Sequence, residues 1–225
     1  MESPNIWRHT ATYEIENRAA DPDGRLWRAL EACADWRDRV VLDLGCGTGF
    51  HLPRFAETAD HVVGVEPHAG LLRLAARRTR DLGNITLRVG TAQQIPLPDH
   101  SVDTVHIRWA YFFGPGCEPG LAELARVVRP GGTALVIDND GSRSTFGAWF
   151  RRGYPHLDPP DTIERFWTTH GWTLERVDMG WRFESRADLE EVVRIELNPE
   201  TAEQVLRHHE GLEVDYAVDL WWKRF

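Results

Sequence analysis

Apolar and polar positions divide most of the chain into an alternation of helices and short buried strands. Apolar residues recur at helical spacing over residues 24–36, and the segment 39–44 that follows is almost uninterrupted in its apolar character. The same alternation continues to about residue 140. The predicted strands are 39–44, 61–65, 85–89, 102–109 and 133–138, and the predicted helices are 24–36, 51–58, 69–80 and 120–128. This order predicts a parallel sheet with helices on both faces.

The pattern changes beyond residue 140. A stretch containing Pro and Trp extends to residue 160, and a helix near 161–170, a strand near 173–183, two helical segments and a last strand near 214–223 are expected after it. The run Arg129-Pro130-Gly131-Gly132 predicts a turn before strand 133–138. The predicted fold is therefore α/β, with a Rossmann-like, doubly wound, mostly parallel sheet of seven strands whose last strand runs antiparallel beside the sixth.

The composition is that of a globular protein with one domain. The chain has 225 residues, of which 42% are hydrophobic and 27% are charged. Its net charge of −9 opposes binding to a phosphate backbone, so no nucleic-acid partner is expected. No signal peptide or membrane segment is recognisable, and a cytoplasmic location is expected. Cys33, Cys46 and Cys117 lie far apart, which predicts neither a disulfide framework nor a metal site.

The most specific local signal is a glycine-rich turn between the first predicted strand and its helix. The sequence there is Val41-Leu42-Asp43-Leu44-Gly45-Cys46-Gly47-Thr48-Gly49. A dinucleotide fingerprint would need a glycine at position 50, where the chain has Phe50, and this argues against a nicotinamide cofactor. Asp43 would also repel a pyrophosphate. An acid here favours a cationic ligand, and S-adenosylmethionine (SAM) carries an ammonium and a sulfonium but no phosphate.

This turn resembles motif I of class I SAM-dependent methyltransferases, especially the small soluble group similar to ubiquinone and menaquinone biosynthesis methyltransferases (methyltransferase type 11-like). The resemblance covers residues 39–140, including the segments 90–103 and 124–132. It implies that Glu66, about 20 residues beyond Gly45, accepts hydrogen bonds from the ribose hydroxyls. Thr91 replaces the acid usual in the family, so the adenine amino group must be bound by Gln93, a backbone carbonyl or water.

The residues predicted to bind SAM come from the turn, from the ends of the strands and from the N-terminal region. They are Tyr13, Asp43, Gly45, Cys46, Gly47, Gly49, Glu66, Pro67, Ala92, Gln93 and Arg108. Tyr13 resembles a tyrosine that covers the methionine part of the cofactor in related enzymes. Arg108 is expected to pair with the SAM carboxylate or with an acidic acceptor.

The methyl acceptor is expected beyond the carboxyl ends of the strands, where open α/β sheets bind ligands. The segments that follow the fourth and fifth strands are rich in aromatic residues, which predicts a small aromatic or apolar acceptor. Direct in-line displacement at a sulfonium depends mainly on alignment, so a catalytic base is optional. Candidate bases are His9, Tyr111, Asp138 and His156, with Asp140 as a further acid near the cleft.

The sequence thus predicts one SAM-dependent methyltransferase domain over residues 1–225, as a monomer or homodimer without a metal. Within it, residues 1–23 form an arm over the active site, 39–140 the cofactor-binding core, and 141–225 a segment that completes the sheet and contacts the substrate. One alternative is methylation of RNA or protein, which the acidic charge and the lack of an Asn/Asp-Pro-Pro-aromatic signature disfavour. Another is a non-catalytic SAM-binding protein with a regulatory or assembly role.

Overall fold

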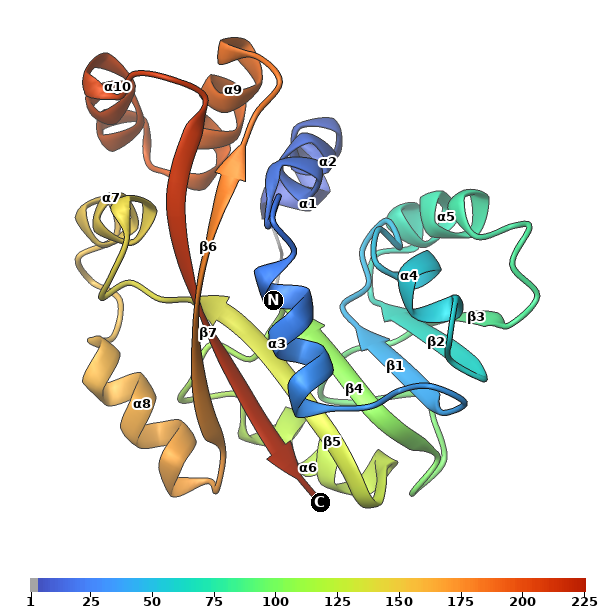
Figure 1. Cartoon of the computed structure of the whole chain (residues 1–225). Helices are drawn as coiled ribbons and strands as arrows, with labels where there is room; N and C mark the ends of the chain where they lie inside the picture. Colours follow the sequence, from blue (N-terminus) through green and yellow to red (C-terminus); the bar gives the residue numbers. More distant parts are fainter. Residues whose placement is uncertain (1–3) are drawn as a thin grey trace. The chain divides into compact units, whose positions relative to one another are not determined.

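The structure is a computed structural model that describes residues 4–225, so residues 1–3 of the expected N-terminal arm lie outside the described residues. Within the described part, seven strands form one sheet in the order β3-β2-β1-β4-β5-β7-β6 (Figure 1). The strands are β1 (Val40–Leu44), β2 (His61–Glu66), β3 (Ile85–Val89), β4 (Val102–Arg108), β5 (Val128–Asn139), β6 (Thr173–Arg182) and β7 (Glu213–Arg224). The first five pair in parallel, and β7 runs antiparallel, so the predicted fold class is confirmed.

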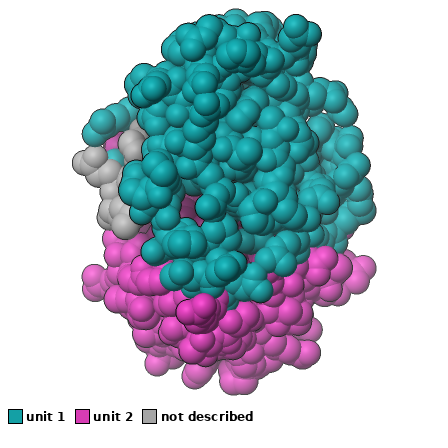
Figure 2. Space-filling view, turned by 90° about the vertical axis from the view of Figure 1, so that its left-hand side faces the viewer, with its two compact units in different colours: residues 1–29, 139–164, 176–219 teal, residues 30–138, 165–175, 220–225 magenta. Residues whose placement is uncertain are grey.

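Helices connect and flank these strands. They are α1 (Pro4–Arg8), α2 (Thr10–Ala19), α3 (Arg25–Cys33), α4 (Leu52–Ala56), α5 (Ala69–Arg78), α6 (Glu118–Val127), α7 (Thr145–Gly153), α8 (Pro160–Thr169), α9 (Arg186–Glu196) and α10 (Pro199–His208). The chain divides into two compact units, coloured separately in Figure 2. Unit 1 takes in Met1–Ala29, Asn139–Glu164 and Arg176–Asp219, and unit 2 takes in Leu30–Asp138, Arg165–Glu175 and Leu220–Phe225.

Unit 2 contains the parallel part of the sheet. β1 lies between β2 and β4, and its side chains from Val41 to Leu44 are all buried. A strand covered on both faces has an almost continuous run of apolar residues, and this is why β1 could be predicted from the sequence. α4 packs on β2, and α5 packs on β2 and β3. Because parallel strands end at the same edge, the turn after β1 and the acid at the end of β2 meet there.

The predicted turn at residues 129–132 is wrong, because these residues belong to β5. Their partner comes from the far end of the chain. Gly131 N donates to Phe225 O at 2.6 Å, and Phe225 N donates to Gly132 O at 2.9 Å. Gly131 has a φ of 84°, and the pairing with β4 shifts register between Val102 and Thr104, so the strand continues through an irregular segment. The Pro-Gly-Gly run therefore forms the irregular first part of β5 and not a turn.

Each unit has its own aromatic cluster. In unit 2, Trp167 stacks on Trp221 with ring centroids 5.8 Å apart, and Trp172 meets Trp167 edge-on. In unit 1, the ring of Phe146 lies 4.5 Å from those of Trp181 and Tyr216. Phe146 belongs to α7, in a stretch for which no helix was predicted. The side chain of Ser144 caps α7 by accepting from Gly147 N, and the buried face of the helix packs through Phe146.

A pair of carboxyl groups joins three helices of unit 1. Glu196, at the end of α9, is hydrogen-bonded to Glu16 of α2, and Asn5 of α1 donates to Glu196 Oε1 at 2.5 Å. Burial raises the pKa of Glu196 to about 7, although the hydrogen bonds from Asn5 and Glu16 oppose part of that rise. Two carboxylates this close disfavour double ionisation, so we expect the pair to retain a proton near neutral pH.

We predict that Glu196→Gln removes a pH dependence of stability. The folded state retains a proton that the unfolded chain releases, so the wild-type free energy of unfolding should fall as pH rises from about 4.5 to about 7 and then level off. Between pH 5 and pH 8, the free energy of unfolding of the variant should therefore rise relative to that of wild type by on the order of 2–3 kcal/mol. Urea unfolding at several pH values measures this difference.

Glu191→Gln, at an exposed position on the same helix, is the control and should leave the pH slope unchanged. Parallel pH profiles for wild type and the Glu196→Gln variant would show that Glu196 ionises normally.

Candidate functional site

The turn between β1 and α4 is built from three glycines in the left-handed backbone region. Their φ values are 81° for Gly45, 55° for Gly47 and 74° for Gly49. Gly45 N and Cys46 N both donate to Val65 O, at 2.8 and 3.1 Å, which ties the turn to the end of β2. A Cβ added at Gly45 would lie 2.6 Å from the Ala110 Cβ, so a side chain has no room there. The turn therefore needs glycine for both conformation and packing.

The side chain of Glu66 is fixed beside this turn. Glu66 ends β2 and is only 5% exposed. Its Oε2 accepts from Gly47 N at 3.2 Å, and its Oε1 accepts from His68 N at 3.0 Å. A carboxylate has about four acceptor positions. The acid and the glycine turn therefore form one rigid unit at this edge of the sheet.

Arg108 brings a buried positive charge to the carboxyl end of β4. It is 8% exposed, and its guanidinium carbon lies 4.2 Å from the centre of the Trp109 ring. Its Nη1 lies 3.4 Å from His51 Nε2. Burial, reinforced by the charge of Arg108, holds the pKa of His51 well below its usual value, so the imidazole is neutral and can accept from Arg108.

Three residues next to the glycine turn were not predicted from the sequence to belong to the site: His51, Arg78 and His106. Arg78 Nη1 donates to both Thr48 O and Thr48 Oγ1 at 2.9 Å, and its guanidinium lies over the Phe50 ring. His106 Nδ1 lies 2.8 Å from Asp43 Oδ1. His51, directly after the glycine turn, was the one with a local signal, since its position next to the motif is visible in the sequence. The other two depend on contacts with elements distant in the chain.

The segment expected to contact adenine forms a tight loop after β3. Thr91 N and Gln94 O pair across it at 3.4 Å. Ala92 is buried, whereas Gln93 is exposed and is hydrogen-bonded to the hydroxyl of Tyr111. Pro67, which follows Glu66, is exposed. Gln93 therefore has the exposure that its predicted role requires, and its link to Tyr111 connects this loop to the segment after β4.

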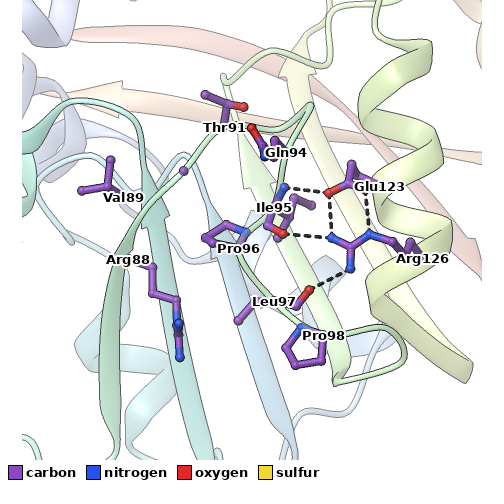
Figure 3. Close-up of a pocket in the computed structure, with 11 residues that line it drawn as sticks. Arg88, Val89, Thr91, Gln94, Ile95, Pro96, Leu97, Pro98, Glu123 and Arg126 are labelled. Atoms are coloured by element: carbon purple, nitrogen blue, oxygen red, sulfur yellow. Dashed lines mark hydrogen bonds and ion pairs between the residues drawn. The ribbon is translucent and has the colours of Figure 1, made fainter.

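A hollow of about 880 Å³ lies next to this loop, between β3 and α6 (Figure 3). Arg126 of α6 lies at its edge and donates to Ile95 O and Leu97 O at 2.9 and 2.7 Å, while Glu123 binds both Arg126 and Ile95 N. These groups use their polar atoms to hold the segment 95–97 in place. We therefore interpret the hollow as the outer side of a support for the cofactor loop and not as the cofactor site.

The candidate bases are distributed over the two units. Tyr111 belongs to unit 2, and burial raises the pKa of its phenol, so it remains protonated at neutral pH. Tyr111 and Trp109 both have positive φ values, 57° and 49°, which is costly for large side chains and typical of functional segments. His9 and His156 belong to unit 1 and are exposed. Tyr13 lies in α2, also in unit 1.

The candidate base Asp138 and the further acid Asp140 lie at the end of β5 or directly after it. Asp138 lies in the last part of the strand. Asp140 is 2% exposed and accepts from Ser142 N and from Arg143 Nε, at 2.8 and 2.7 Å. Burial works to raise the pKa of Asp140, but these hydrogen bonds outweigh it and keep the pKa below its usual value. Asp140 therefore acts as a structural anion and is a poor proton acceptor.

Over residues 4–225, the structure has no group of three or more His, Cys, Asp or Glu side chains arranged to hold a metal ion. In the same part of the chain, no helix combines the length and the apolar character needed to cross a membrane.

Comparison with known proteins assigns this site to a family. Residues 41–132 match the family model described as a methyltransferase domain. The chain is 33% identical over 125 residues to a demethylmenaquinone methyltransferase of Listeria welshimeri, covering 51% of this chain and 53% of that protein. It is 32% identical over 132 residues to a ubiquinone/menaquinone biosynthesis C-methyltransferase of Rubrivivax gelatinosus, covering 58% and 50%. The chain thus spans about half the length of these relatives.

Solved structures share the fold over most of the chain. The YcgJ protein of Bacillus subtilis aligns with a TM-score of 0.64 and 16% identity, covering 90% of this chain and 99% of that one. A SAM-dependent methyltransferase of Aquifex aeolicus aligns with a TM-score of 0.56 and 17% identity, covering 93% and 97%. With the glycine turn and Glu66 in place, residues 41–132 form a methyltransferase domain of the class I, SAM-dependent type.

Proposed function

We propose that the protein transfers the methyl group of SAM to a small aromatic or apolar molecule by in-line displacement. The observation that carries the proposal is the hydrogen bond of 3.2 Å from Gly47 N to Glu66 Oε2, because it joins the glycine turn and the acid in one site. Bound SAM supplies an electrophilic methyl group on a sulfonium that is already a good leaving group. The residues of the chain therefore have to bind, orient and exclude water, and the proposal requires no strong base.

Each end of SAM has a matching group in unit 2. Glu66 accepts hydrogen bonds from the ribose hydroxyls, and Gln93 and the loop around Ala92 contact the adenine. Asp43 attracts the ammonium, and Arg108 pairs with the carboxylate. The open backbone at Gly47 lets the ligand approach the main chain closely. In this arrangement the charged groups of the methionine part meet charges of opposite sign.

The acceptor contacts aromatic side chains that follow β4. Trp109, Tyr111 and Phe113 lie in this segment, and Phe113 is 42% exposed. Aromatic walls of this kind bury ring faces and exclude water. The similarity to quinone biosynthesis methyltransferases supports a phenol or hydroquinone as the first acceptor class to test. Tyr111, which stays protonated, donates a hydrogen bond to an acceptor oxygen in this proposal.

We predict that the protein methylates a small aromatic acceptor in an assay with methyl-labelled SAM. Phenols, hydroquinones, aromatic amines and apolar alcohols are incubated with the protein, and products are identified by mass spectrometry. Total RNA and an unfolded protein mixture serve as alternative acceptors. Labelling of those polymers alone would contradict the proposal, and cofactor binding without turnover of any acceptor would favour a non-catalytic SAM-binding protein.

We predict that Glu66→Ala weakens binding of S-adenosylhomocysteine by about 1–3 kcal/mol, because the ribose loses a charged acceptor. Isothermal titration calorimetry measures the change. Glu57→Ala removes an exposed carboxylate from the preceding loop and should leave the affinity unchanged. Equal affinities for the wild-type and Glu66→Ala proteins would remove Glu66 from the ribose site.

Gly47→Val should abolish detectable binding of S-adenosylhomocysteine. A β-branched residue is strained at a φ of 55°, and its side chain would occupy the space where the ligand approaches. Gly83→Val is the matched control, since a Cβ there meets nothing within 4 Å. Thermal unfolding of both variants separates lost binding from lost folding. Retained affinity in a folded Gly47→Val variant would mean that the turn is only structural.

A further inference from the structure

A histidine and an aspartate form a buried pair on neighbouring strands of unit 2. Asp43 of β1 is paired in register with His106 of β4, and His106 Nδ1 lies 2.8 Å from Asp43 Oδ1. The two side chains are 1% and 5% exposed, for His106 and Asp43 respectively. An ionised carboxylate can only accept, so the imidazole carries its hydrogen on Nδ1 and donates it to Asp43.

The imidazole of His106 is held in one orientation. Its ring lies 5.1 Å from the ring of Phe55, which belongs to α4, and 5.6 Å from the ring of His51, which directly precedes that helix. Burying a polar ring is unfavourable unless it makes a specific hydrogen bond. His106 makes such a bond to the acid of the glycine-turn motif.

The hydrogen bond leaves the second oxygen of Asp43 available. Among the described residues, Asp43 Oδ2 accepts no hydrogen bond, whereas Oδ1 is engaged by His106. Fixing one oxygen of a carboxylate determines where the other points.

The same strand carries a charge of opposite sign two residues further on. Residues 106 and 108 are on one face of β4, because side chains alternate along a strand. His106 therefore orients an anion, and Arg108 supplies a cation. The amino-acid end of SAM has an ammonium and a carboxylate on one carbon atom, and a pair of opposite charges is the complement that such a zwitterion needs.

We propose that His106 is a positioning residue that orients the Asp43 carboxylate toward the ammonium of SAM, so that the amino-acid end of the cofactor is recognised. This inference rests on the proposed function, in which Asp43 binds that ammonium. His106 itself does not touch the cofactor and acts through Asp43.

Two ligands that differ only in the amino-acid end test the role. S-adenosylhomocysteine has this end, whereas 5′-methylthioadenosine has the adenosine and the thioether without it. His106→Leu should lower the affinity for S-adenosylhomocysteine about tenfold, as expected for a misplaced charged hydrogen-bond acceptor. The affinity for methylthioadenosine should stay within about twofold, because that ligand has no ammonium to be positioned.

Replacing His106 by asparagine or by glutamine tests which nitrogen of the imidazole is needed for cofactor binding. The amide nitrogen of asparagine can occupy the place of Nδ1, while that of glutamine reaches the place of Nε2. His106→Asn should therefore retain most of the wild-type affinity for S-adenosylhomocysteine, and His106→Gln should lose as much as His106→Leu. Ile107→Val, a packing change at the next residue of the strand, is the control and should change neither affinity.

A parallel loss of affinity for both ligands in His106→Leu and His106→Gln would show a structural role and overturn the inference. Unchanged affinity for S-adenosylhomocysteine in His106→Gln would overturn it too, even where the leucine variant does not fold. If the wild-type protein bound neither ligand, the proposed function itself would be wrong. Wild-type binding combined with either of the first two results would refute the role of His106 alone.

Discussion

The path of the chain from β1 into α4 is the constraint on which the cofactor side of the structure depends. Gly45 N and Cys46 N both donate to Val65 O, and Gly47 N donates to the Glu66 side chain. The end of β2 therefore fixes the turn after β1 through successive backbone donors. Glu66 accepts hydrogen bonds from this turn and from its own loop, so its position follows from the fold and needs no ligand to set it.

Much of this arrangement could be predicted from the sequence, because the signals are local or periodic. β1 and β2 are buried apolar runs, and parallel strands covered on both faces produce such runs. The beginning of β5 could not be predicted in this way. Residues 129–132 look like a turn, and they become a strand because Gly131 and Gly132 exchange hydrogen bonds with Phe225. A partner at the opposite end of the chain leaves no trace in the local pattern.

The same distinction applies to the site. Glu66 and the glycines could be found because their spacing along the chain is fixed by the strand–turn–helix geometry. His106 could not be assigned a role, since its relation to Asp43 depends on the register of β1 against β4. Arg78 reaches Thr48 from the far end of α5. Residues that we propose to bind the ligand thus appear in a motif, whereas those that hold them in place appear only in the folded structure.

The match to the methyltransferase domain covers residues 41–132 and ends there. Beyond it, Glu196 connects several parts of unit 1. Tyr154 donates to Glu196 O at 3.1 Å, and the ring of Phe150 lies 5.0 Å from that of Tyr154. Asn5 and Glu16 bind the side chain of the same glutamate. Glu196 therefore links the N-terminal helices, through its side chain, with the aromatic residues at the end of α7, through its backbone carbonyl. Evolution of a different acceptor would, on our proposal, alter the aromatic segment after β4 and would leave the glycine turn unchanged.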